Sequence, residues 1–395
     1  MKQVYSIQLF ICLFCLSSFM PIRQARQNVI FELQFTDKAL PGTNDSIFLA
    51  GDFNGWHTAD TAFAFKKNRK GIYVLKTKLS PGQHAFKVVR GSWQTVETDR
   101  EGQAINNRIL DVEKLSGRGA IHLELKIAGW ADHFASVPVK STAASNVDIL
   151  DTAFLMPELN RQRRIWIYLP KNYKQDTSRD YPVLYMQDGQ NVFDDATAFS
   201  GEWSVDEYLN SLPDSKQCIV IAVDNGGNER MLEYNPFNNK QFGKGEGKAY
   251  VSFLARTLKP FIDQHYRTKP EARFTAIAGS SMGGLISYYA AISYPGVFGR
   301  AGIFSPSFWI APEIYDSTRT VLSKLNNTAF YFYGGGKEGD SLQGRLAQMT
   351  SLLKQNASII TTTDFNAEGM HEEKYWRASF KNFYGWLTEL QARNP

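Results

Sequence analysis

A serine set among small residues stands between a predicted apolar strand and a predicted helix. The turn reads Gly279-Ser-Ser-Met-Gly283, so Ser281 is the central residue of a G-x-S-x-G pattern. Small residues two positions before and after the serine let strand and helix approach closely, and such a turn holds the hydroxyl out on a strained backbone. The first N–H groups of the helix, expected over 282–294, point at charge that develops on a substrate oxygen. We therefore expect Ser281 to be the nucleophile of an acyl transfer and the N–H of Met282 to be an oxyanion donor.

Two histidines lie in the C-terminal part of the chain, and only one of them follows the serine. In α/β-hydrolases the catalytic groups occur in the order serine, acid, histidine. His265 precedes Ser281 inside a predicted helix, whereas His371 lies in a loop between the last predicted strand and the last helix. We expect His371 to accept the Ser281 proton and to return it to the leaving alcohol.

Two carboxylates follow the predicted strand 329–333, in Gly334-Gly-Gly-Lys-Glu-Gly-Asp340. Glu338 comes first, and the glycines let the loop bend toward the histidine, so Glu338 is expected to orient His371. Asp340 stays open as the alternative, although an acid there would also suit the N-cap of the next helix. The glycines also match G-x-G-x-x-G, but they do not open a βαβ unit and no acid follows at the spacing of a ribose ligand, so no nucleotide site is expected.

Strands and helices alternate from residue 148 to the C-terminus. Strands are expected at 164–169, 181–186, 218–223, 274–278, 300–304, 329–333 and 358–363, and helices at 249–265, 282–294, 343–355 and 374–390. This alternation predicts a doubly wound, mostly parallel α/β sheet with its site at the carboxyl ends of the strands. The turn Asp188-Gly-Gln190 leaves strand 181–186 at that edge. The N–H of Gln190, or of the neighbouring Gly189, is the expected second oxyanion donor.

The first third of the chain has the pattern of a β-sandwich. Short alternating segments at 29–35, 46–50, 71–76 and 84–89 are separated by turns such as Asn54-Gly55 and Pro81-Gly82. Residues 1–25 carry Lys2 and an apolar run, which is typical of a secretory signal peptide. We expect a signal peptide at 1–25, a sandwich at 28–126, a linker at 127–147 and a catalytic unit at 148–395, in a periplasmic or secreted protein.

Composition limits the partners. The net charge is +5, with Lys and Arg scattered among the acids, so nucleic acid is not an expected partner. No His/Cys cluster has metal-ligand spacing, so we expect neither a metal nor another cofactor. The apolar run near the N-terminus is too short for stable membrane insertion. The sequence leaves the oligomeric state open.

The catalytic part resembles the esterase family that includes enterochelin-type, feruloyl and acetylxylan esterases. The matching segments are Met156-Pro-Glu-Leu159, Arg164–Pro170, Gln187–Gln190, Trp203, Asp224–Arg230, Glu233–Pro236, Gly279–Gly284 and Gly369–His371. The resemblance implies an α/β-hydrolase in which substrate is bound by Asp188, Gly189, Trp203, Asn225, Arg230, Glu233 and Tyr234. One departure is that the family's acid is often Asp, whereas Glu338 stands at that position.

The upstream part resembles the early-set sandwich of the glycogen-binding and isoamylase N-terminal type, on Gly51-Asp-Phe-Asn-Gly-Trp56 and Phe86–Trp93. Trp56 or Trp93 could stack on sugar rings, although a packing role beside the enzyme is the stronger expectation. The combined prediction is a serine carboxylesterase acting on a small-molecule or polysaccharide ester. The alternatives are an acyltransferase of the same fold and a glycan-binding protein with a vestigial hydrolase unit.

Overall fold

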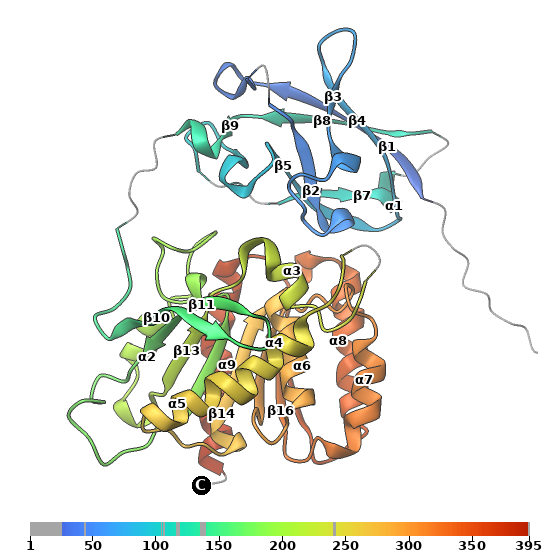
Figure 1. Ribbon diagram of the computed structural model, residues 1–395. Helices are drawn as coiled ribbons and strands as arrows, with labels where there is room; N and C mark the ends of the chain where they lie inside the picture. The colour runs from blue at the N-terminus through green and yellow to red at the C-terminus, as the bar shows by residue number, and fades with distance from the viewer. Residues whose placement is uncertain are drawn as a thin grey trace, which may run out of the picture.

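The chain forms two units in a computed structural model, a β-rich unit followed by an α/β unit (Figure 1). The structure describes residues 26–42, 45–103, 105, 107–115, 119–134, 140–239 and 242–393, without the side chains of Glu113, Lys114 and Asp340. The predicted signal peptide and the middle of the predicted linker lie outside these residues. No helix in the described part is both long enough and apolar enough to span a membrane.

One eight-stranded sheet forms the centre of the α/β unit, in the order β10-β11-β13-β12-β14-β15-β16-β17. The strands are β10 (Val147–Met156), β11 (Arg161–Tyr168), β12 (Val183–Gln187), β13 (Ile219–Val223), β14 (Thr275–Ser280), β15 (Arg300–Phe304), β16 (Ala329–Gly335) and β17 (Ile360–Asn366). The pairs from β13 to β17 are parallel, and β10 and β11 are antiparallel to their neighbours. The predicted mostly parallel α/β-hydrolase sheet is confirmed.

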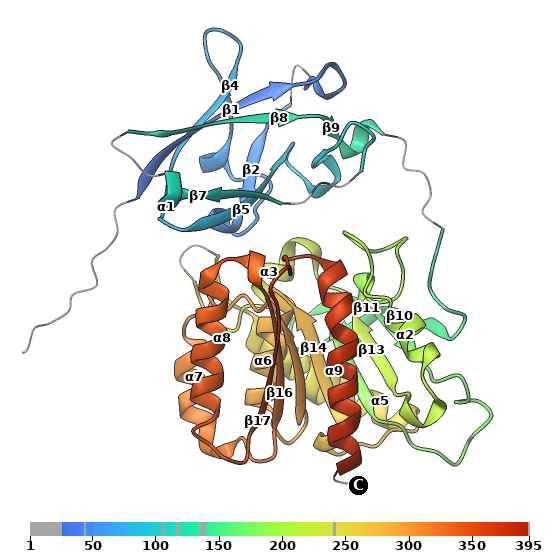
Figure 2. The same cartoon turned by 180° about the vertical axis from the view of Figure 1, so that it is seen from behind.

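Helices cover both faces of this sheet (Figures 1 and 2). One face carries α4 (Gly247–Phe253), α5 (Lys259–His265), α6 (Met282–Ser293), α7 (Ile314–Val321) and α8 (Asp340–Leu353), and the other carries α2 (Val205–Ser211) and α9 (Glu373–Arg393). Side chains alternate along each strand, so Tyr185 of β12 packs in the first core and Met186 in the second. With both faces occupied, the carboxyl edge of the sheet remains for a site.

The β-rich unit is built from small, mostly antiparallel sheets around a separate core. Its strands are β1 (Gln27–Phe35), β2 (Phe48–Gly51), β3 (Lys66–Lys67), β4 (Tyr73–Leu79), β5 (Gln83–Val89), β6 (Glu97–Thr98), β7 (Arg108–Asp111), β8 (Ile121–Ile127) and β9 (Gly129–Trp130). Strand β9 falls within the stretch predicted to be linker. Its residue Trp130 is fully buried, and the indole N–H donates to the Ala39 carbonyl at 2.8 Å, so this part of the stretch packs on the β-rich unit. Assignment to the early-set sandwich stays a prediction.

Candidate active site

The turn between β14 and α6 holds Ser281 in an uncommon backbone conformation. Its φ is +58° and its ψ is −120°, a region that a residue with a side chain enters only when its surroundings enforce it. The Ser281 N–H donates to the carbonyl of Phe304 on β15 at 2.9 Å. The tight turn therefore fixes the half-buried hydroxyl directly before the first turn of α6.

Two glycines make this turn possible. A Cβ on Gly279 would lie 2.7 Å from the backbone of Gly283, and a Cβ on Gly283 would lie 2.9 Å from a carboxylate oxygen of Asp188. The last contact also shows that the turn beginning at Asp188 lies against the turn that carries Ser281. The predicted oxyanion residues Met282 and Gln190 thus come from two adjacent turns.

Replacing Gly279 with Ala should destabilise the fold by roughly 1–3 kcal/mol, because backbone atoms would have to move. Gly385→Ala is the matched control, since a Cβ there meets nothing within 4 Å and Gly385 lies inside α9. In thermal unfolding Gly385→Ala should be neutral or stabilising by up to about 1 kcal/mol. Equal Tm values for the two variants would contradict this account of the turn.

Glu338 and His371 form a hydrogen-bonded pair. Glu338 Oε2 lies 2.6 Å from His371 Nδ1, and the Glu338 side chain is 3% exposed while that of His371 is 39% exposed. A carboxylate accepts only, so Nδ1 is assigned as the donor and Nε2 is left as the acceptor. This is the tautomer that a general base facing a serine requires.

The glycines of the predicted acid loop bring its backbone against the histidine loop. A Cβ on Gly335 would lie 2.4 Å from the carbonyl of Gly369, and one on Gly336 would lie 2.4 Å from that of Ala367. The packing of the two loops accounts for the G-x-G-x-x-G match. Helix α8 begins at Asp340 with Gly339 as its N-cap residue, so the expectation that Asp340 is the N-cap is wrong.

A hydroxyl that the sequence reasoning did not single out holds the other oxygen of Glu338. Ser305 Oγ donates to Glu338 Oε1 at 2.7 Å, and the Gly335 N–H donates to the same oxygen at 2.8 Å. The indole N–H of Trp376 in turn donates to Ser305 Oγ at 2.9 Å, and the Trp376 ring stands edge-on to His371 with centroids 4.9 Å apart. The feature of the sequence that could have identified Ser305 is its position directly after β15, the strand next to the one that ends at the nucleophile turn.

Ser305→Ala should lower kcat by roughly 10- to 100-fold, because a hydrogen bond to a charged group is lost and the carboxylate is less firmly positioned. Since Ser305 has a φ of +44°, Ser305→Gly is the matched variant that removes the hydroxyl without backbone strain. Both variants should lose kcat with little change in KM. A loss seen only with Ala, or only in KM, would contradict the positioning role.

Ser281 and the His371–Glu338 pair line one cavity of about 1220 Å³ that extends between the two units. In this structure the hydroxyl of Ser281 pairs with that of Ser307 at 3.2 Å. Catalytic hydrogen bonds in ligand-free enzymes are often long and tighten only with substrate. The wall opposite the serine comes from the β-rich unit and includes Phe53, Trp56, His57, Phe63 and His84. The Trp93 ring is tilted against that of Trp56, with centroids 6.1 Å apart, and stands edge-on to Phe199 of the α/β unit at 5.7 Å.

The turn predicted to complete the oxyanion site begins with Asp188 in the left-handed region, at φ +55°. Gly189 lies against the backbone of Ala222 and Val223, where a Cβ would be 2.8 Å from Val223. Gln190 Oε1 accepts from the Asn225 N–H at 3.2 Å, which ties this turn to the one after β13. The donor roles of Gln190 and Met282 stay predictions.

The residues predicted to bind substrate make contacts within the protein. Asp188 is buried and accepts from Arg230 at 2.6 and 2.9 Å and from the Asn225 amide at 2.7 Å, so its carboxylate is engaged in an ion pair with a half-buried arginine. Glu233 is fully buried and accepts from Arg161 at 3.0 Å and from Arg163 at 2.5 Å.

Tyr234 is fully buried, and its hydroxyl oxygen accepts from the Asp188 N–H at 3.2 Å. Trp203 packs edge-on against Phe304 at 4.9 Å and lies 6.1 Å from Trp376. Of the described residues that line the cavity, none is among the seven predicted to bind substrate. Their roles in substrate binding stay predictions. The contacts of Asn225 and Tyr234 hold the turn that begins at Asp188.

One further carboxyl group lies close to this arrangement. Burial raises the pKa of Glu373 to about 7, the charge on Asp188 adds to the rise, and His371 and Arg230 oppose it. Glu373 therefore changes its charge near neutral pH beside the candidate site.

Comparisons with known proteins identify the family of the α/β unit. Residues 156–387 match the model of the Esterase family, whose description is "Putative esterase". The uncharacterized protein YbbA of Bacillus subtilis is 28% identical over 242 residues, which cover 57% of this chain and 92% of YbbA. An endo-1,4-beta-xylanase/feruloyl esterase of Xylanibacter ruminicola is 24% identical over 242 residues, which cover 58% of this chain and 30% of that protein.

Among solved structures, the BES protein from Bacillus cereus superposes with a TM-score of 0.54 at 18% identity, covering 64% of this chain and 99% of that chain. At this identity the likeness shows the fold. The family match spans more than half of the chain and includes the turn of Ser281 and both loops of the Glu338–His371 pair. The chain belongs to the Esterase family and is a carboxylic ester hydrolase.

Proposed function

We propose that the protein is a serine esterase with Ser281 as nucleophile, His371 as general base and acid, and Glu338 as the orienting carboxylate. The observation that carries the proposal is the 2.6 Å contact between Glu338 and His371 Nδ1, in the same cavity as a serine held at positive φ. Ser281 Oγ attacks the ester carbonyl while His371 Nε2 takes its proton. Collapse of the tetrahedral intermediate breaks the carbon–oxygen bond, and the same proton goes to the leaving alcohol.

Water then enters the space that the alcohol has left and attacks the carbonyl carbon of the acyl-enzyme. His371 takes a proton from the water and returns it to Ser281 as the acid leaves. The N–H groups of Met282 and Gln190 are proposed to stabilise the oxyanion in both steps. Support comes from the adjacency of their two turns, where Gly283 leaves no room for a side chain beside Asp188.

The proposed substrate is an aromatic acyl ester of a carbohydrate or related molecule. The cavity exceeds the usual volume of a small-ligand pocket, roughly 300–1,000 Å³, and aromatic rings of both units line it. Trp56 and Trp309 face it from opposite units and offer stacking surfaces for a phenyl or sugar ring. The relation to a bifunctional xylanase/feruloyl esterase supports this class. The signal-like segment at 1–25 supports action outside the cytoplasm.

A substrate panel tests this function. The purified chain should hydrolyse p-nitrophenyl acetate slowly and a feruloyl saccharide with the highest kcat/KM, with acetylated sugars between them. Product analysis with an added sugar acceptor separates water from a sugar hydroxyl as the second nucleophile. Turnover of none of these esters would contradict the proposal.

Trp56→Ala should lower kcat/KM for a feruloyl saccharide by roughly tenfold. A tenfold loss corresponds to about 1.4 kcal/mol, the free energy expected from the lost contact between the Trp56 ring and the substrate. Hydrolysis of p-nitrophenyl acetate should change little, because a small ester does not reach the opposite wall. Phe365→Ala is the control, since this exposed ring on β17 is not among the residues lining the cavity. An equal loss with both substrates would exclude a substrate-binding role for Trp56.

A further inference from the structure

A group of acidic side chains surrounds the loop that precedes α2. It consists of Asp194, Asp195, Glu202, Asp206 and Glu207. The charges that act most strongly on Glu202 are those of Glu207, Asp195 and Asp194, and Glu207 acts on Asp206 in the same way. Like charges this close repel, so the native state must contain something that compensates them.

Three of these carboxylates converge. One oxygen from each of Glu202, Asp206 and Glu207 lies within 4.8 Å of the others. Calcium binds oxygen ligands at about 2.3–2.6 Å, so two ligands on opposite sides of the ion are separated by about 4.8 Å. The spacing suits an oxygen-ligated divalent cation.

Burial supplies a second, independent observation. Glu202 is 2% exposed and Asp206 is fully buried. Glu202 Oε2 and Asp206 Oδ1 have no hydrogen-bond partner among the described residues. A buried carboxylate oxygen without a partner is costly, and a cation or a proton removes that cost.

Protons are the competing occupant. Burial raises the pKa of both Glu202 and Asp206, the former to about 7. Glu207 is exposed and gives the group a route to solvent, from which a cation and its remaining water ligands could enter.

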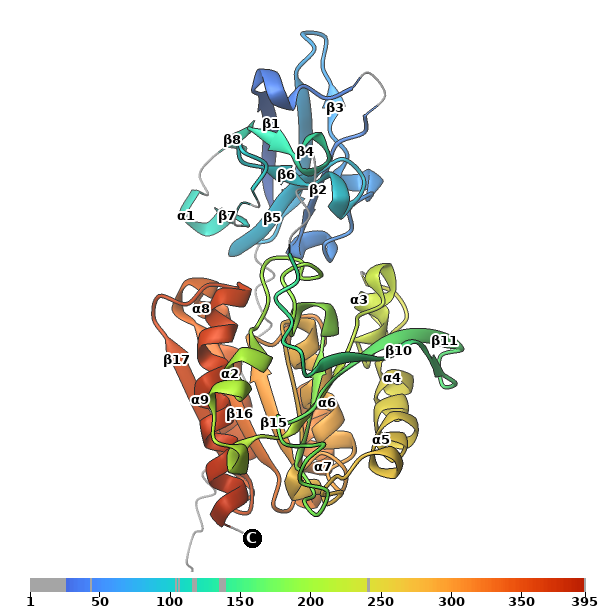
Figure 3. The same ribbon diagram turned by 90° about the vertical axis from the view of Figure 1, so that its left-hand side faces the viewer.

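The same loop holds residues 140–146, the part of the connecting segment that leads into β10 (Figure 3). Asp194 accepts from Ser141 Oγ at 2.8 Å and from the Thr142 N–H at 3.1 Å. Asp206 Oδ2 accepts from the Ala144 N–H at 2.7 Å. An ion bound by Asp206 would therefore stabilise the attachment of this segment.

We propose that Glu202, Asp206 and Glu207 form a structural calcium site that fixes the segment connecting the two units to the α/β unit. Carboxylates and water are the ligands that Ca²⁺ prefers, and its irregular coordination tolerates a partly exposed site. The site is separate from the Ser281 cavity, whose lining includes none of the three residues.

The test uses the full chain after treatment with EDTA and buffer exchange. Isothermal titration with CaCl₂ should show one site with a Kd below about 1 mM. Saturating Ca²⁺ should raise Tm by roughly 5 °C or more. It should also slow cleavage by a protease within residues 140–146. Mg²⁺ should bind more weakly.

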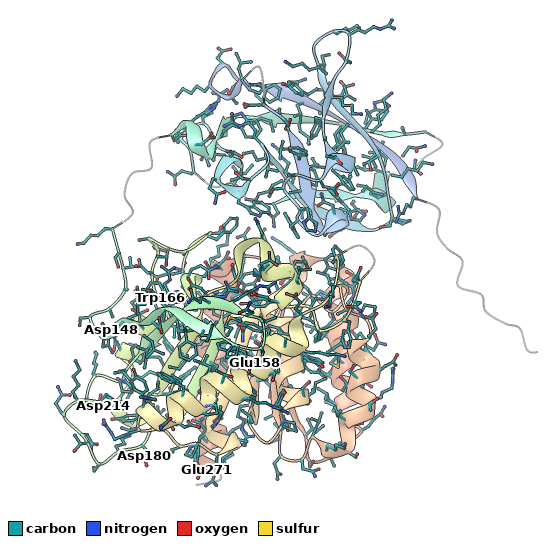
Figure 4. The ribbon with its side chains drawn as sticks, in the orientation of Figure 1. Asp148, Glu158, Trp166, Asp180, Asp214 and Glu271 are labelled. Carbon is teal, nitrogen blue, oxygen red and sulfur yellow. The ribbon has the colours of Figure 1, made fainter. Side chains whose placement is uncertain are left out.

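Glu202→Gln and Asp206→Asn should each weaken calcium binding by at least tenfold and reduce the Tm response. Glu271→Gln is the matched control, an exposed acid at the end of the α/β unit away from the β-rich unit (Figure 4). Absence of calcium binding by the wild type, or unchanged binding by both site variants, would overturn the proposal. The titration of the wild-type chain shows whether it binds calcium even if a variant fails to fold.

Discussion

Ser281→Ala should lower kcat/KM by roughly three to six orders of magnitude for every ester that the protein hydrolyses, the range found when a triad nucleophile is removed. Without the Ser281 hydroxyl the proposed acyl-enzyme cannot form, so water attack assisted only by the oxyanion donors would remain. The fold should be unaffected, because Ala occupies nearly the same space, although the positive φ of Ser281 persists.

Ser280→Ala is the control for this change. Ser280 is the last residue of β14 and is buried, so its hydroxyl does not reach the cavity. We expect its kcat/KM to stay within about tenfold of the wild type. Ser281→Ala with activity in that same range would remove Ser281 from the mechanism.

Glu338→Gln should lower kcat by about 10⁴-fold, because an amide can present its NH₂ to His371 Nδ1 and so favour the wrong tautomer. The loss should appear in kcat more than in KM, since Glu338 acts through its hydrogen bond to His371. Tm should fall as well, because Ser305 and the Gly335 N–H would lose a charged acceptor.

Asp340→Asn separates the two candidate acids. Asp340 is the first residue of α8, so its charge is favourable near the helix N-terminus by roughly 0.3–1 kcal/mol. The variant should lose that stability and keep most of its kcat. The reverse ranking of the two kcat values at matched Tm would transfer the orienting role to Asp340.

Chain order led from the sequence to the candidate catalytic residues. The turn of Ser281, the loop of Glu338 and the loop of His371 each follow an apolar strand, and parallel strands place their carboxyl ends at one edge. The structure brings Glu338 and His371 into contact there. The mostly parallel sheet was predictable from the alternation of strands and helices, and the esterase family was predictable from its motifs.

Contacts that depend on packing between distant elements were not accessible. Ser305 acts on Glu338 only because β15 and β16 are neighbours in the sheet. The resemblance implied that Asp188 and Arg230 bind substrate, and the ion pair that they form could not be read from the sequence. Strand β10 was missed because its apolar and polar residues do not alternate regularly, and register shifts interrupt its pairing with β11.

The relation between the two units also could not be read from the chain. Trp56 was expected to pack beside the enzyme or to stack on sugar rings, and its place in the lining of the cavity that contains Ser281 could not be read from the sequence. The group around Glu202 was invisible because Asp194 and Glu202 are brought together by the loop before α2 rather than by motif spacing.

The most direct test of the account is the site of covalent labelling by a fluorophosphonate. Intact-mass analysis followed by peptide mapping should find one adduct per chain, on Ser281, with labelling greatly slowed in His371→Ala and absent in Ser281→Ala. An unlabelled wild type, or an adduct on any other residue, would contradict a mechanism in which His371 activates Ser281.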